Sequence, residues 1–230
     1  FHVFGLSGGD IAVKSGRIKG VADAHYADRR KIVQRPPLTV KQILMLERTV
    51  HDDSRTSYDR IASGFFLMLI YGRLRYSDGL QLVDLHIDAH DTGTGVTGFL
   101  EARAERTKTS VTLERKIRFL PVAVPLDSLL DQSCMPVWME LREHAGLHGD
   151  NPHPMLPSPQ MGGGWSMMLS VGAAADWLRS LVKVESNSKD RLATHSCKAT
   201  MLSMAAKFGL DHSTRRLLGY HSSGRDQSLL

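Results

Sequence analysis

Arginine, lysine and histidine side chains recur in four short segments that lie far apart along the chain. The segments are 73–78 (RLRYSD), 105–110 (ERTKTS), 194–198 (THSCK) and 217–221 (LLGYH). Cationic and imidazole donors suit one chemistry above others, the stabilisation of negative charge that develops on an oxyanion. Because each segment alone is typical of a solvated helix end or turn, their order and the elements that carry them must decide their meaning.

Length and composition indicate a globular protein. The chain has 230 residues, of which 42% are hydrophobic and 23% are charged, and this excludes a disordered, collagen-like or coiled-coil protein. Its two cysteines, Cys134 and Cys197, are too few for a disulfide framework. We therefore expect an intracellular protein, nuclear if the source is a eukaryote and otherwise cytoplasmic. The longest apolar run, residues 65–71, is too short to span a membrane.

The charge of the chain is unevenly distributed. The net charge is +5, with basic ends at residues 1–60 and 181–230 and an acidic middle at residues 121–180. This distribution suggests one basic surface assembled from distant segments, which would favour an anionic partner, but basic ends are also common in proteins with no nucleic-acid role. The chain starts without an initiator Met, so we expect a piece of a longer polypeptide.

The spacing of apolar residues predicts a mainly helical α+β domain with a small three-stranded antiparallel sheet. Thr39 is expected to cap the first helix of this domain. Further helices are predicted over 61–74, 77–82, 137–144, 171–182, 191–208 and 213–218, with a short one at 22–33. Strands are predicted around 85–87, 98–104 and 116–124, and loops at 107–113 and 149–165.

In this order the segments resemble the catalytic domain of the tyrosine recombinases, the phage-integrase type of DNA recombinase. That family has a Pro-Leu-Thr helix start and an arginine in a pattern close to Gly-Leu-Arg-x-Ser-Glu. A hairpin lysine, a helical His-x-x-Arg and a Leu-Gly-His motif follow before the nucleophilic tyrosine. The matching residues here are Pro37-Leu38-Thr39, Arg75, Lys108, His195 with Lys198, and His221.

The resemblance implies a division of the chain and a reaction. Residues 1–34 would be the tail of an N-terminal DNA-clamping domain with its linker, and residues 35–230 the catalytic domain. The implied function is that of a mobile-element-like, site-specific recombinase or integrase, which transesterifies DNA through a 3′-phosphotyrosyl intermediate. It needs no cofactor and no metal, because protein cations stabilise the phosphate.

Each matched residue has an implied role in that reaction. Arg75 would grip the phosphate with its planar fork, and Lys198 would add a second positive charge. His195 would donate to the phosphate or manage the proton of the attacking oxygen, while His221 would be a further donor. Lys108 would protonate the leaving 5′ oxygen.

Three departures from the family pattern accompany the match. Lys198 replaces the second arginine, which keeps the charge but loses the fork. Tyr220 stands where strict register places the histidine, so His221 lies one residue later. The nucleophile is expected at or after Leu229-Leu230, and no tyrosine occurs after Tyr220.

The implied partner is double-stranded DNA, bound by a homo-oligomer, a tetramer on paired sites, without a membrane. Candidate DNA contacts are Arg30, Lys31, Arg106 and Arg215. The alternative of another class is a recombinase-derived DNA-binding protein without cleavage activity, which Lys198 and the missing tyrosine favour.

A metal-dependent hydrolase is a more distant alternative. It would use the pairs His86/His90 and His144/His148, which have i, i+4 spacing. The first pair falls on a predicted strand, where that spacing separates the residues by about 13 Å. Shared ligation is therefore disfavoured there, and the second pair is more typical of a polar helix end.

Overall fold

The computed structural model describes residues 35–93, 96–104, 120–147, 154–183 and 192–219, together with Gly16, Gly20 and Val21. Contacts between residues divide the chain into two compact units, Phe1–Gln34 and Arg35–Leu230. The candidate site residues Arg75, His195 and Lys198 belong to the second unit. The assignment of residues 1–34 to a DNA-clamping domain stays a prediction.

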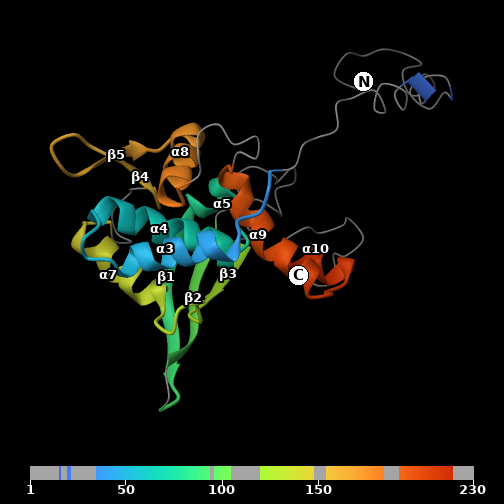
Figure 1. Ribbon diagram of the computed structural model, residues 1–230, viewed down its shortest axis with the longest axis horizontal. Helices are drawn as coiled ribbons and strands as arrows, with labels where there is room; N and C mark the ends of the chain where they lie inside the picture. Colours follow the sequence, from blue (N-terminus) through green and yellow to red (C-terminus); the bar gives the residue numbers. More distant parts are fainter. Residues whose placement is uncertain are drawn as a thin grey trace. The chain divides into compact units, whose positions relative to one another are not determined.

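Two adjacent helices form the centre of this unit. Helix α3 (Val40–His51) begins after Thr39, whose side chain accepts from Gln42 N while the Gln42 side chain accepts from Thr39 N. This capping box confirms the helix start expected at Thr39. Helix α4 (Ser57–Tyr71) lies beside α3 (Figure 1), and every residue from Ile61 to Tyr71 is buried.

Helices α7 (Cys134–His144), α8 (Val171–Leu181) and α9 (Thr194–Lys207) pack against α4. Trp138 of α7 is fully buried, and its indole N–H donates to the carbonyl of Ile61 at 2.9 Å. The ring occupies the space over Gly64, where any β-carbon would overlap it. Within the described ranges, no helix is both long and apolar enough to cross a membrane.

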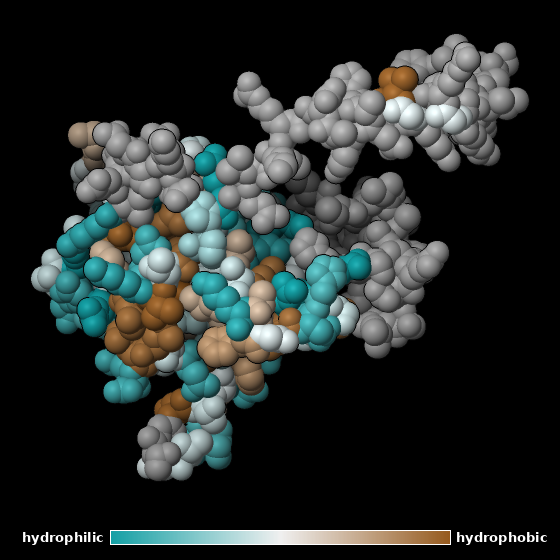
Figure 2. Space-filling view, turned by 45° about the vertical axis from the view of Figure 1, so that its right-hand side comes forward, coloured by the Kyte–Doolittle hydropathy of each residue, from teal (hydrophilic) through white to brown (hydrophobic). Residues whose placement is uncertain are grey.

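A three-stranded antiparallel sheet in the order β1-β2-β3 confirms the predicted fold class. Its strands are β1 (Leu82–Asp91), β2 (Val96–Ala104) and β3 (Leu120–Pro125). The outer part of the β1–β2 hairpin extends away from the helices (Figure 1). Polar and apolar atoms lie side by side on this projection (Figure 2), which exposes Val96 and Phe99.

A buried carboxylate fixes the segment that follows β3. Glu47 of α3 is fully buried and accepts from the Tyr71 hydroxyl at 2.6 Å. It also accepts from the backbone N–H groups of Leu129 and Leu130, each at 3.0 Å. A charge removed from water needs such partners, and these three tie α3, α4 and residues 129–130 together. Burial and the bond to Glu47 raise the pKa of Tyr71.

Two local expectations are wrong. Helix α5 (Tyr76–Gly79) is a single turn and does not reach residue 82, because Leu82 already pairs with Ala104 in the sheet. Residues 149–165 were expected to be a loop, yet β4 (Pro157–Pro159) and β5 (Trp165–Met168) form a two-stranded hairpin there. A two-stranded ladder has only edge strands, which tolerate proline, and three glycines at positive φ make its turn.

The remaining predicted elements are the last helix and three segments that lie outside the described residues. The last helix, α10 (His212–Leu218), agrees with the predicted 213–218. The predicted helix at 22–33, the loop at 107–113 and residues 116–119 of the third strand lie outside the described residues.

Substituting Gly64→Ala should destabilise the domain, because the new methyl group overlaps the Trp138 indole within a close-packed core. We expect a loss of about 1–3 kcal/mol in the free energy of unfolding, measured by urea titration followed by circular dichroism. Gly172→Ala, on the exposed side of α8, is the matched control, and its new methyl group meets only Ser170 Oγ at 3.9 Å. Equal stability of the two variants would contradict this packing.

Candidate functional site

Arg75 lies directly between the two helices α4 and α5. Its backbone is extended (φ −73°, ψ 154°), and it precedes the single turn of α5 as the N-cap residue. The guanidinium is 3.7 Å from the Asp78 carboxylate, and the Arg75 side chain is 41% exposed. An ion pair this long and this exposed contributes little to the free energy of unfolding. A phosphate could therefore compete for this guanidinium with little loss.

Arg73, two residues earlier, ends α4 in an unusual conformation. Its φ is +54°, the left-handed region in which glycine is preferred. The N–H groups of Arg73 and Leu74 donate to the carbonyls of Ile70 and Leu69, which is the Schellman pattern with arginine in the glycine position. That conformation costs a non-glycine residue about 1–2 kcal/mol.

The Arg73 side chain holds two helix ends. Nε donates to the carbonyl of Leu218 at 3.0 Å, and Nη1 donates to the carbonyl of Tyr71 at 3.1 Å. Both carbonyls belong to the last residue of a helix, α10 and α4, respectively, where intrahelical partners run out. A cation is stabilising at this negative end of the helix dipole.

Helix α9 carries His195 in its first turn and Lys198 one turn later. Its entry is fixed by Arg179 Nη1, which donates to the carbonyl of Leu192 at 2.8 Å, and by Ala193 N, which donates to Ser196 Oγ at 3.1 Å. His195 is exposed, whereas Lys198 is only 7% exposed. Lys198 Nζ donates to the carbonyl of Gly219 at 2.6 Å.

The end of α10 is therefore the point at which three predicted segments meet. Leu218 and Gly219 present neighbouring carbonyls, one to Arg73 and the other to Lys198. The chain carrying Arg75, the helix carrying His195 and the residues just before Tyr220-His221 are joined by these two hydrogen bonds. Figure 1 shows α10 at the outer end of α9, away from α7.

Most of the other predicted site residues lie outside the described residues. These are Lys108, His221, Arg30, Lys31 and Arg106. Arg215 is described, and its Nε donates to the carbonyl of Leu210 at 3.0 Å, so its guanidinium folds back on the loop before α10.

The fold can be compared with known structures. No protein-family model matches the sequence, and no curated protein matches it. A Flpe mutant in complex with a DNA Holliday junction has a TM-score of 0.52 at 13% identity, over 94% of this chain and 54% of that one. A Flp recombinase–Holliday junction complex has a TM-score of 0.50 at 13% identity, over 90% of this chain and 50% of that one. This chain has the fold of a tyrosine-recombinase catalytic domain.

The site-specific recombinase XerH bound to its difH substrate is a weaker match, on which this assignment does not rest. Its TM-score is 0.47 at 11% identity, over 85% of this chain and 50% of that one. The chain thus spans about half the length of the solved structures it matches. The recombinase fold is shared at low identity, so activity and partners must be argued from the residues.

Arg73 is the site residue that the sequence analysis missed. In the recombinase pattern Gly-Leu-Arg, the position of Arg73 belongs to glycine, and the structure gives this residue the backbone that glycine would adopt. The arginine at that position was visible in the segment RLRYSD. Its partner, the carbonyl of Leu218, lies 145 residues further along the chain, and no local pattern reveals such a contact.

Cys197 lies between the two candidate residues of α9 without being reactive itself. It is fully buried, and burial raises the pKa of its thiol to about 12. His86 and His90 lie on β1, as expected, where His86 is 3.2 Å from Glu101. Among the described side chains, no group of three or more histidines, cysteines or carboxylates could hold a metal ion.

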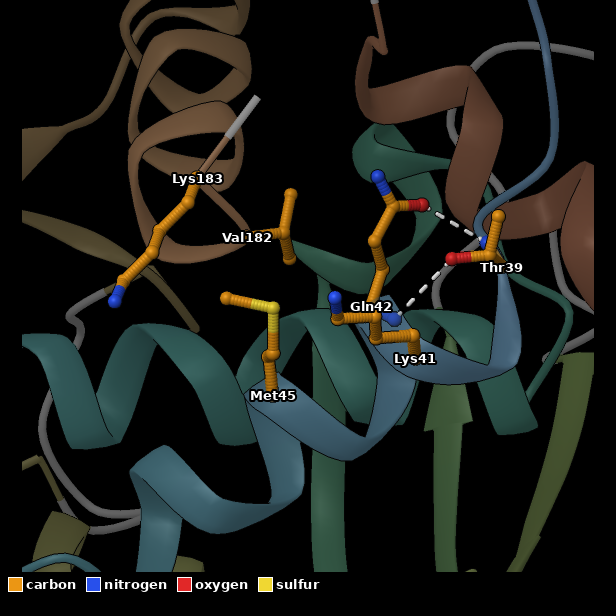
Figure 3. Close-up of a pocket in the computed structure, with 6 residues that line it drawn as sticks. All are labelled: Thr39, Lys41, Gln42, Met45, Val182 and Lys183. Carbon is orange, nitrogen blue, oxygen red and sulfur yellow. Dashed lines mark hydrogen bonds between the residues drawn. The ribbon is translucent and has the colours of Figure 1, made fainter. Parts of the chain in front are cut away.

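A hollow of about 500 Å³ lies between the start of α3 and the end of α8 (Figure 3). Its lining residues are Thr39, Lys41, Gln42, Met45, Val182 and Lys183. The two hydrogen bonds of the capping box cross its rim in Figure 3. Among the predicted catalytic residues that the structure describes, Arg75, His195 and Lys198, none lines this hollow.

The native protein should be inert to thiol reagents. Cys134 and Cys197 are the chain's two cysteines, both are buried, and burial raises each thiol pKa to about 12. At pH 8 the thiolate fraction is then only about one in ten thousand, and the thiolate is the reacting form. We expect no release of chromophore from a disulfide reagent until urea unfolds the chain, and then two equivalents.

The same pKa shift predicts the direction of a pH effect. A thiol with a raised folded-state pKa favours the folded state only while the unfolded thiol stays protonated. Stability should therefore fall as the pH rises above about 9, the region in which unfolded thiols ionise. For the labelling experiment, fast reaction of a folded sample with the disulfide reagent at pH 8 would contradict the burial of these side chains.

Proposed function

We propose that this chain is the catalytic domain of a site-specific DNA recombinase that acts through a 3′-phosphotyrosyl intermediate. One observation carries the proposal: the hydrogen bonds of Arg73 and Lys198 to adjacent carbonyls at the end of α10. They connect the segments of Arg75, His195 and His221 within a recombinase fold. Coincident matches in unrelated segments would have no reason to share one location.

The reaction assigns each cation to a place where charge develops. A tyrosine oxygen attacks the phosphorus, the bond from phosphorus to the 5′ oxygen breaks, and Lys108 gives that oxygen its proton. Arg75, whose exposed guanidinium is held weakly by Asp78, donates to the non-bridging oxygens. His195, exposed in the first turn of α9, donates to the phosphate or accepts the proton of the tyrosine.

Lys198, whose amine reaches the end of α10, and His221 complete this set. Lys198 supplies positive charge from beneath Gly219, and His221 adds a donor two residues beyond that glycine. A charge that is largely shielded from water interacts with a phosphate over several ångströms, without direct contact. The DNA backbone would be contacted by Arg30, Lys31, Arg106 and Arg215. Four copies of the protein would assemble as a tetramer on paired DNA sites.

A DNA-binding protein without cleavage activity is the second candidate. The burial of Lys198, at 7% exposure, and its short bond to a backbone carbonyl favour it, because this lysine then serves the fold. Binding through surface cations would survive in such a protein, with an affinity that falls steeply with salt. Covalent attachment to DNA separates the two candidates.

The full-length protein should form a covalent adduct with DNA nicked beside the scissile phosphate. Arg75→Ala should reduce the rate of adduct formation by about 10²–10³-fold, the usual effect of removing one donor to a developing oxyanion. Denaturing gel electrophoresis of labelled DNA measures the adduct, and a chelator should leave its rate unchanged.

Arg55→Ala is the matched control. It removes one positive charge just before the first residue of α4, whereas Arg75→Ala removes one after the last residue. Arg55 precedes Ser57, where α4 begins, and its own partner is Asp52 at 3.7 Å. Its adduct rate should equal that of the wild type. DNA binding without any adduct would favour the inactive DNA-binding protein, and loss of the adduct with chelator would favour a metal-dependent reaction.

A further inference from the structure

We propose that Arg73 is a positioning residue that fixes the end of α10, at Leu218 and Gly219, relative to Arg75. The inference rests on the proposed function and adds to it a residue that the recombinase pattern does not supply. The pattern places glycine at this position, where the backbone is left-handed (φ +54°).

Helix α10 depends on such a contact because its own residues provide little packing. None of its seven residues is buried, and Leu217 is 55% exposed. A short helix of this kind is marginal in water without tertiary contacts. Among the described residues, side-chain bonds to its carboxyl end come from Arg73 at 3.0 Å and from Lys198 at 2.6 Å.

The guanidinium is suited to this position in a way that other cations are not. Two of its nitrogen atoms bind two separate helix ends, through the carbonyls of Leu218 and Tyr71. Lysine has one nitrogen on a flexible stem and would not hold the ends of α4 and α10 in a fixed relation. Arg75 follows α4 by four residues, so the relation that Arg73 fixes is the one between Arg75 and the end of α10.

Arg73→Gly is the decisive variant, because glycine suits the left-handed backbone and the fold should remain intact. Hydrogen exchange in the DNA-free protein should become at least 10-fold faster at the amides of α10 and unchanged in α3 and α4. With nicked DNA, the cleavage step at saturating DNA should slow at least 10-fold, while the Kd for DNA stays within 3-fold. Arg73→Lys should fall between wild type and Arg73→Gly.

Lys183→Gly is the matched control for hydrogen exchange. Lys183 is also a left-handed residue (φ +51°) that ends a helix, α8, so the variant makes the same backbone change and removes the same charge. Its α10 amides should exchange at the wild-type rate. An α10 exchange rate unchanged by Arg73→Gly, or a parallel loss of DNA binding and cleavage, would overturn the inference.

Failure of the proposed function can be distinguished from failure of the inference about Arg73. If wild-type protein forms no DNA adduct, the recombinase activity and the role of Arg73 in cleavage are both refuted. Hydrogen exchange then still decides whether Arg73 fixes α10.

Discussion

The arrangement of the site depends on two cations that bind neighbouring carbonyls at the end of one short helix. Helix α10 has no buried residue to hold it, so hydrogen bonds to its last carbonyls do what apolar packing does for α4. Arg73 comes from the turn after α4 and Lys198 from α9, which themselves pack together. These charge-assisted hydrogen bonds thus attach the weakly packed helix α10 to the rigid core.

In the proposed recombinase site, these two residues would lie close to the bound phosphate. Lys198 is 7% exposed and donates to the carbonyl of Gly219. Arginine in its place would offer several donors in a fixed plane, whereas a lysine offers a compact charge that follows its acceptor. The replacement of the family arginine therefore suits a residue that both supports α10 and contributes positive charge.

The parts of the fold that were predicted from the sequence are those that local signals determine. The Thr39 cap, the apolar run of α4 and the β1–β2 hairpin each have their signal within a few residues. The failures have the opposite origin: Leu82 belongs to a strand because Ala104 pairs with it, 22 residues later. Arg142 of α7 makes a further contact that no local signal indicates, because it is buried and donates to the carbonyls of Met155 and Leu147. For the site, residue types were predictable, but the contact between Arg73 and Leu218 was not.

Arg73 is one of the residues with an unusual backbone conformation. Three non-glycine residues in the described ranges have positive φ: Arg73, Asp84 and Lys183. Asp84 lies at a bulge in β1, where a short polar side chain tolerates this conformation and pairs with Arg103. Arg73 has no such tolerance, and glycine would relieve its strain at no cost to the Schellman turn. This unfavourable backbone accompanies side-chain bonds to two helix ends, which supports a role for Arg73 in the geometry of the site.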